Sequence, residues 1–331
     1  DPRTEAAQDF YDTDTWTYTE NRALIVLNYL MGSFGFNAQE TDLDLQSFRV
    51  AADLCDEKVT IPLPKVNTGL DIPDFWHWEI GEHVRVQSGV RFPGYRPWQG
   101  ATQTEQPKYA AGAVLDPKDG VVKNTKLLLE GMGWALPWSN GKHKLIIEGE
   151  VDGPVMHFDE DSIMGGWNVE RGMRADRLNR VTVEFPNRNK QYQDDTVSWP
   201  AIGSEDHNAF KAEDQNQDLH TNQSAETITD FYRAQAYAEY LVRKSRVNPR
   251  IRGLQLSPKA MLLEPGDVIS LYYEDKGFGR ETKADGTEYE GTLFIVERVD
   301  ISAFLDVRVD LIKYDPTVYG APALEQEPIP N

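Results

Sequence analysis

The chain has 331 residues, with 34 lysines and arginines against 54 aspartates and glutamates, which gives a formal net charge of -20. Wrapping of nucleic acid requires Lys and Arg to replace condensed counterions, so this charge argues against such a role. The length suffices for about two domains with a sizeable buried core, and the single cysteine excludes an internal disulfide.

No stretch of the sequence has the length of a membrane span. The longest aliphatic run, Ala23 to Leu27, is far shorter than the roughly 20 residues that a spanning helix needs. The N-terminus lacks the pattern of a signal peptide. The chain starts at Asp1, and residues 321–331 form an acidic, Pro-rich strip that resembles a linker. We therefore expect a soluble piece of a longer polypeptide, without membrane insertion.

Residues 21–59 are predicted to form two amphipathic helices. The glycines of the turn at 32–36 separate them, because glycine favours a bend that a helix interior resists. The second helix places four residues on one face that should be buried, at i, i+3, i+4 and i+7: Phe48, Ala51, Ala52 and Cys55. Ser47 or the Asp42/Asp44 pair is expected to cap its start.

Residues 62–112 combine prolines with aromatic side chains. The prolines exclude a long helix, so strands and ordered loops are expected, with 83–87 as the clearest strand. Trp76, Trp78 and Trp98 could form a platform for sugar rings, yet such rings serve a packed insertion or a subunit interface more often.

The middle of the chain mixes short elements. A helix is predicted at 121–131, and Asn140-Gly141 predicts a hairpin because both residues tolerate positive φ. Residues 179–185 alternate as a strand with one apolar side. Residues 193–222 are polar and acidic and are predicted to form a long surface loop.

A long helix and a β-rich end are predicted for the remainder. The helix runs from Ser224 to about Ser245, with an apolar stripe along one side. Basic residues from 243 to 252 suit the negative end of its dipole. Four strands follow, at 254–257, 267–273, 292–299 and 305–312. Together these elements predict an α+β protein with a helical hairpin, mixed α/β parts and a C-terminal small antiparallel β-barrel or sandwich.

No familiar catalytic or metal-binding motif occurs. Phosphate-binding loops, zinc-protease helices and the hydrolase elbow are all absent from the sequence. The histidines lack metal-ligand spacing; His77 and His83, for example, are expected to be surface or packing residues. Cys55 is expected to behave as a small buried hydrophobe rather than as a nucleophile. We name no catalytic, cofactor-binding or metal-binding residue.

Acidic residues close to tryptophans suggest an alternative function as a glycosidase. Asp159 to Asp161 lie near Trp167, and Asp194 and Asp195 lie near Trp199. Catalytic carboxyl groups must face each other across a sugar, and neighbours in sequence rarely do so. The acidic turns are therefore expected to be solvated structure.

The order of these segments resembles one known family. An aliphatic helix, a Gly-containing turn and an acidic stretch precede Ser47-Phe48-Arg49-Val50-Ala51-Ala52-Asp53-Leu54-Cys55-Asp56-Glu57-Lys58-Val59, and this pattern resembles the tip attachment protein J family of long-tailed phages. Three further segments follow in the family's order, at 161–185, 234–241 and 263–269. Each piece is weak alone, and the colinear order over residues 17 to 319 carries the resemblance.

The resemblance implies a structural protein of the virion, made in the host cytoplasm. Family members form the hub at the distal end of the tail, where three chains present paired barrel-like domains as a pseudo-sixfold ring. It implies a homotrimer that contacts the tail tube, tip components and tape measure, with DNA passing through without specific binding. Contact with the host cell surface would come through regions missing from this chain.

The predicted organisation has five parts: 1–60, helical part of a hub domain; 61–118, aromatic and Pro-rich insertion; 119–200, helix, hairpin and strands; 201–320, long helix and barrel; and 321–331, linker. The predicted function is a structural, non-enzymatic hub segment of a phage or prophage tail tip. The alternatives are a glycan-binding or glycan-cleaving tail component using the tryptophan platform, and a related secretion or gene-transfer particle hub.

Overall fold

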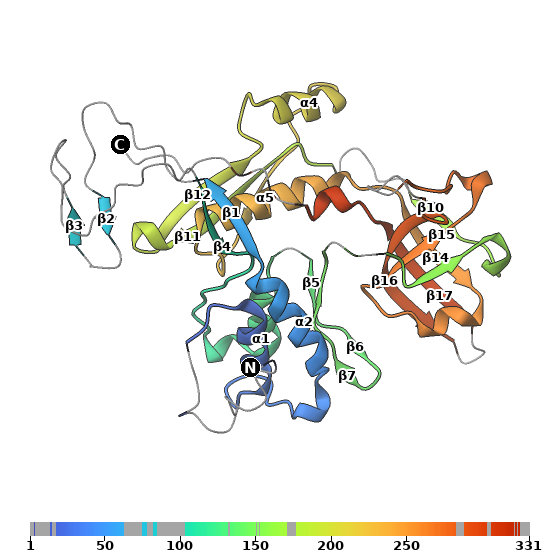
Figure 1. The fold of residues 1–331 in the computed structure, drawn as a ribbon, viewed down its shortest axis with the longest axis horizontal. Coiled ribbons are helices and arrows are strands. Elements are labelled where there is room, and N and C mark those ends of the chain that lie inside the picture. The colour runs from blue at the N-terminus through green and yellow to red at the C-terminus, as the bar shows by residue number, and fades with distance from the viewer. Residues whose placement is uncertain are drawn as a thin grey trace.

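The computed structural model describes residues 3, 14, 18–62, 75–77, 82–84, 103–131, 133–149, 151, 153–170, 177–282, 288–302, 306–320, 322 and 324. These residues form a unit of short helices, a long helix that packs on a three-stranded sheet, and a six-stranded sheet. In Figure 1 the long helix α5 crosses the middle of the molecule, with the helical unit below it and the six-stranded sheet at one end.

The predicted N-terminal helices are confirmed. Helix α1 spans Arg22–Met31 and α2 spans Leu45–Asp56, and the four residues predicted for the inner face of α2 are all buried. Of the proposed caps, Asp44 holds the position, since its carboxylate accepts from the Gln46 amide. Helix α3, Val121–Leu128, packs on α1, so one apolar core unites segments far apart in the sequence.

The Asn-Gly hairpin also forms as predicted. Strand β6, Trp138–Ser139, pairs with β7, Lys142–His143, and β5, Trp134–Ala135, pairs with β8, Ile146–Ile147. Asn140 has φ 51° and Gly141 has φ 79°, the positive values that a two-residue turn of this kind requires.

The aromatic insertion is described only in part. Strand β1, Lys58–Pro62, pairs with β4, Gln103–Pro107, and a short ladder joins β2, Phe75–His77, to β3, Glu82–Val84. The strand predicted at 83–87 overlaps β3. Trp78 and Trp98 of the predicted sugar platform lie outside the described residues.

The prediction of a surface loop at 193–222 is wrong. This segment contains strand β12, Gln193–Trp199, helix α4, Glu205–Glu213, and strand β13, His220–Ser224. Both strands pair with β11, Arg180–Asn187, because the few apolar residues of the segment, such as Trp199, are buried beneath α5. The exposed faces of these strands carry polar residues, so the strands are difficult to recognise from the sequence.

The long helix begins later than predicted. Helix α5 spans Phe231–Arg246, and the Asp230 carboxylate caps it by accepting from the Arg233 amide at 3.1 Å. The preceding residues extend the chain from β13, where Ala225 N donates to Glu184 O at 2.8 Å. The helix therefore starts where the sheet contact ends.

The six-stranded sheet has the order β10-β14-β17-β16-β15-β9. Its strands are β9 Met156–Phe158, β10 Asn168–Glu170, β14 Arg250–Leu256, β15 Val268–Leu271, β16 Thr292–Ile301 and β17 Val307–Lys313. Alternation divides the strands between two clusters: Phe294 and Val296 face one core, and Leu293 and Ile295 face the other.

The predicted C-terminal element, a small antiparallel β-barrel or sandwich, is not confirmed as a closed barrel. Within the described residues β9 and β10 remain at the two edges and do not pair, and β9 runs parallel to β15. Closure depends on which distant strands meet, and strand patterns alone do not determine that. The mixed α+β class holds, while the five predicted domain boundaries stay a prediction.

The remaining short elements are 3-10 turns: η2 Glu40–Asp42, η3 Pro117–Asp119, η4 Glu160–Ser162, η6 Arg188–Lys190, η7 Pro258–Leu262, η8 Glu274–Lys276 and η9 Pro316–Val318. Among the helices that the structure describes, none has both the length and the apolar character to cross a bilayer.

Candidate functional site: two carboxylates at a structural joint

Glu264 fastens the β6–β7 hairpin to the six-stranded sheet. It lies in the turn before β15 and accepts hydrogen bonds from Ser139 Oγ at 2.8 Å and Asn140 Nδ2 at 2.7 Å. Lys144 Nζ completes the set with an ion pair to the same carboxylate. One anionic side chain thus engages three donors from one hairpin, which orients the helical unit against the sheet.

The turn that carries Glu264 fits the hairpin closely. Gly266 has φ 94°, which agrees with the type II turn predicted for Pro265-Gly266. A Cβ atom at this position would lie 2.7 Å from Ile146 Cγ2. Glycine is therefore required both for the backbone conformation and for the approach of the β8 strand.

Glu148, next to β8, is the second carboxylate that joins parts of the fold. Its Oε2 accepts from the hydroxyl of Tyr240 on α5 at 3.1 Å and from the hydroxyl of Tyr319, after η9, at 3.0 Å. Lys244 of α5 forms an ion pair with the same oxygen. This carboxylate joins the helical unit, the long helix and the C-terminal segment.

The local environment sets the protonation of these groups. The hydrogen bond from Lys144 is the main cause that lowers the pKa of Glu264 below its ordinary value. Burial raises the pKa of Tyr240 and of Tyr319 well above that of a free phenol. Both hydroxyls therefore keep their protons and act as donors to Glu148.

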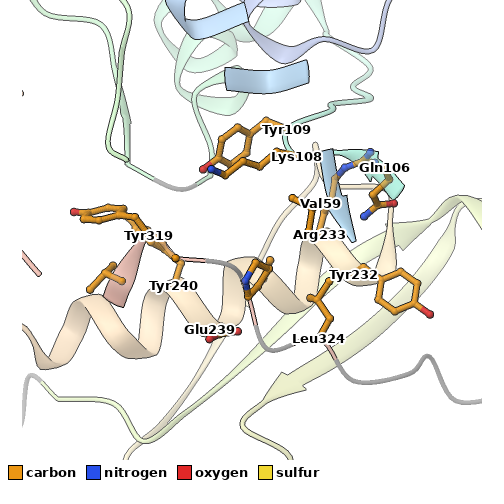
Figure 2. Close-up of a pocket in the computed structure, with 14 residues that line it drawn as sticks. Val59, Gln106, Lys108, Tyr109, Tyr232, Arg233, Glu239, Tyr240, Tyr319 and Leu324 are labelled. Atoms are coloured by element: carbon orange, nitrogen blue, oxygen red, sulfur yellow. The ribbon is translucent and has the colours of Figure 1, made fainter. Parts of the chain in front are cut away.

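A small groove runs along α5 beside this joint. Figure 2 shows Lys108 and Tyr109 facing the helix from above and Tyr319 at one end. Arg233 closes the floor by donating to Pro107 O from Nε at 3.2 Å and from Nη2 at 3.0 Å. The cavity volume is about 40 Å³, room for water rather than for the ligands of about 300 Å³ or more that occupy small-molecule sites.

The acidic turns considered for a glycosidase have structural roles. Asp159 accepts from the Ser162 amide at 3.0 Å and from Ser162 Oγ at 2.7 Å, and the hydroxyl contact is the main cause that lowers its pKa. Asp195 accepts from Asn187 Nδ2 and Lys190 Nζ, each at 2.8 Å. Both carboxylates are thus hydrogen-bonded by residues that lie near them in the sequence.

The other predicted candidates are likewise engaged in the fold. Cys55 is fully buried, and burial raises the pKa of its thiol to about 11. Within the described part of the chain, no group of three or more His, Cys, Asp or Glu side chains is arranged to hold a metal ion.

Four basic residues around the C-terminal end of α5 pair with acids: Arg243, Lys244, Arg246 and Arg252. Arg243 pairs with Glu239 at 2.8 Å, and Arg252 pairs with Glu297 at 2.7 Å. The helix dipole, favoured from sequence, explains only part of this arrangement.

A buried polar network was missed by the sequence analysis. Asp214 is fully buried, and Arg246 Nη1 donates to it at 2.8 Å. Asn179 Nδ2 donates to Gln217 O at 2.8 Å, and its Oδ1 accepts from the Leu219 amide at 2.9 Å. This network anchors the segment after α4. No local pattern in the sequence marks these residues, because their partners are distant along the chain.

The fold is of the mixed α+β class, and Glu148 and Glu264 join its parts. The model of a family described as putative phage tail proteins matches residues 126–283. The chain is also 25% identical over 235 residues to baseplate hub protein pb3 of Escherichia phage T5. That alignment covers 71% of this chain and 23% of the relative, so the chain spans less than a quarter of that protein.

Three solved structures match parts of this chain. A chain of the native gene transfer agent virion gives a TM-score of 0.46 at 14% identity, covering 61% of this chain and 40% of that one. The 43 kDa tail protein of prophage MuSo2 from Shewanella oneidensis gives 0.35 at 12% identity, with coverages of 63% and 56%. Prophage tail protein gp18 from Listeria monocytogenes EGD-e gives 0.30 at 9%, with coverages of 66% and 58%.

The family match and the baseplate hub relative support a structural protein of the phage tail or baseplate, in the virion. This class is broader than the tip attachment protein J family that the sequence pattern resembles.

Proposed function

We propose that the chain is a structural hub segment of a phage or prophage tail tip. It connects the tail tube to the host-attachment parts and surrounds or closes the DNA conduit. The observation that carries the proposal is the similarity to a baseplate hub protein across 71% of this chain.

The joint supports a connector rather than an enzyme. Glu148 and Glu264 fix the helical unit against α5 and the six-stranded sheet. A connector must keep such an orientation under load, and charge-assisted hydrogen bonds give geometric specificity. The cavity of about 40 Å³ beside α5 offers no space for a sugar substrate.

The proposed assembly is a homotrimer in contact with the tail tube, other tip components and the tape measure. A net charge of -20 per copy would repel DNA phosphates at any surface that faces the channel. Screening over about 8 Å at physiological salt limits this effect to residues that line the passage. DNA would then pass without specific binding, and regions outside this chain would contact the host.

Immunogold labelling of purified particles tests the proposal. Antibodies against the chain should place gold at one end of the tail, distal to the capsid. Label along the whole tail or on the capsid would contradict a tip hub. Particles lacking the gene provide the control for antibody specificity.

A second experiment distinguishes the glycan-directed alternative from the hub. Binding to peptidoglycan, or its turnover, that disappears in a Trp76→Ala/Trp78→Ala variant would favour a glycan-directed component. Equal behaviour of the variant and the parent, with gold at the tip, would favour the hub.

A further inference from the structure

The tip of the β6–β7 hairpin carries an Asn-Gly pair that occurs once in the sequence. Among all asparagines of the chain, Asn140 alone is followed by glycine. Asn140 is exposed and has φ 51°. Apart from its chain neighbours, no atom of the described residues lies within 4 Å of a Cβ atom added at Gly141. The backbone nitrogen of Gly141 therefore lies in open surroundings, with no side chain of its own to obstruct it.

An asparagine that precedes glycine can lose its side-chain amide without an enzyme. The backbone nitrogen of the glycine attacks Cγ of the asparagine and forms a new C–N bond. The side-chain nitrogen leaves as ammonia and takes the proton of the glycine amide. Water then opens the cyclic imide at either carbonyl, which gives aspartate or isoaspartate. Water is the only other reactant, and no group is oxidised or reduced.

Glu264 holds the asparagine side chain in another position. Asn140 Nδ2 donates to Glu264 Oε1 at 2.7 Å. An ionised carboxylate only accepts hydrogen bonds, so the amide nitrogen rather than the amide oxygen faces Glu264. A side chain held in this way is not free to turn its Cγ onto the nitrogen of Gly141. The reaction therefore requires that the contact between the hairpin and Glu264 opens first.

The product of the reaction opposes closure of the same contact. Glu264 pairs with Lys144, and Asp267 Oδ2 accepts from the Glu264 amide at 2.8 Å, so two carboxylates already lie near one lysine. Aspartate at position 140 would replace a donor to Glu264 by a third carboxylate, and like charges at this distance repel each other. Isoaspartate would also lengthen the backbone of a two-residue turn.

We propose that Asn140 is a modification site, and that its deamidation keeps the hairpin detached from Glu264 once the contact has opened. The closed contact protects the amide, the open contact exposes it, and the new carboxylate repels Glu264. The change runs in one direction, because the released ammonia is lost to solvent. This inference does not depend on the proposed tail function, so either can fail without the other.

Mass spectrometry of the full chain, aged in mildly alkaline buffer, tests the modification. The peptide that contains Asn140 should progressively show the mass change from amide to acid, and digestion at acidic pH limits further reaction during preparation. Asn37 is the matched control, because it is also exposed and has φ 53°, but is followed by Ala38. It should remain an amide over the same time. No conversion at Asn140, or equal conversion at the two positions, would overturn the inference.

The protection by Glu264 is tested by the rate of conversion. Glu264→Ala removes the acceptor and should raise the rate at Asn140 several-fold. Glu264→Gln, which keeps the shape, should give a smaller increase and serves if the alanine variant does not fold. Glu105→Ala, at an exposed residue of β4, is the control and should leave the rate unchanged. Equal rates in the parent chain and in the Glu264 variants would contradict the protection and overturn the inference.

The effect of the product is tested with Asn140→Asp. Amide exchange in residues 138–145 should be several-fold faster in this variant than in the parent chain, while the six-stranded sheet keeps its protection. Asn208→Asp, at an exposed residue of α4, makes the same chemical change elsewhere and should leave exchange at 138–145 unchanged. Equal exchange in Asn140→Asp and the parent chain would show that the product does not keep the contact open, and would overturn the inference.

Discussion

Two joints in this molecule are built from different interactions. The six-stranded sheet meets α5 through apolar and aromatic contacts, where Val247 and Tyr319 pack against the cores on both sides. The helical unit instead meets its neighbours through Glu148 and Glu264 with six donors around them. Apolar burial is insensitive to protonation, whereas carboxylate contacts depend on it. The comparison indicates that the contacts of the helical unit, rather than those of the six-stranded sheet, respond to changes in protonation.

The largest expected effect lies in the apolar sheet. Phe294 is fully buried and meets Phe278 edge to face at 5.3 Å. Phe294→Ala should lower the free energy of unfolding by about 3 to 5 kcal/mol, because it removes apolar contacts and leaves a cavity. Urea unfolding measures this loss, and Leu262→Ala at an exposed site should change little. Equal midpoints for the two variants would contradict this core.

A somewhat smaller loss is expected in the buried network behind α4. Arg246→Ala leaves Asp214 buried without its cationic partner, which costs about 3 kcal/mol in comparable cases. Amide exchange in residues 213–219 should accelerate with the loss of stability. Arg250→Ala, at an exposed residue, is the control. Unchanged exchange in the Arg246 variant would show that the network does not hold this segment.

A smaller loss of stability is expected from a substitution at Glu264, in the polar joint. Glu264→Gln keeps the shape but removes the charge that Lys144 and its neighbours engage, so the unfolding free energy should fall by about 1 to 2 kcal/mol. Exchange at 138–145 should rise while the six-stranded sheet stays protected. Glu105→Gln is a matched exposed control. Loosening of the sheet rather than of the hairpin would refute the assigned role.

The pH dependence of the joint follows from the lowered pKa of Glu264. Its contribution is fully present above the ordinary value of 4.5 and is lost as pH falls through the lower folded value. The stability difference between the parent chain and Glu264→Gln should therefore be constant at pH 6 to 7 and should shrink below about pH 4. A difference that grows on acidification would contradict the sign of this shift.

The smallest effect on stability is expected at Trp138, in the β6–β7 hairpin. Trp138→Ala changes an exposed ring, so the unfolding free energy should shift by less than about 0.5 kcal/mol. Calorimetry checks this expectation: a large fall in the melting temperature would mean that Trp138 supports the fold.

Local sequence patterns predicted the elements whose partners are near in the chain. The buried face of α2 follows from the spacing of Phe48 and Cys55, and Asn140-Gly141 defines its hairpin. The prediction for segment 193–222 is wrong because Trp199 and Asp214 are buried by contacts with residues far along the chain, such as Arg246. Strand edges and sheet closure depend on the same kind of distant pairing.

The joint could be predicted only in part. The sequence indicated the hairpin and the Pro265-Gly266 turn, but not that Glu264 would accept from Ser139 and Asn140. These donors and their acceptor lie far apart in sequence, and any of the many acids could have filled the role. Which acid accepts these hydrogen bonds is determined by the tertiary structure.

A cryo-electron microscopy reconstruction of the intact particle tests the central claim most directly. We expect three copies of this chain around the axis at the distal end of the tail, with the helical unit and the six-stranded sheet in the relative orientation described above. Copies placed elsewhere in the particle, or a chain wrapped around a bound saccharide at opposed carboxylates, would contradict a structural tail hub.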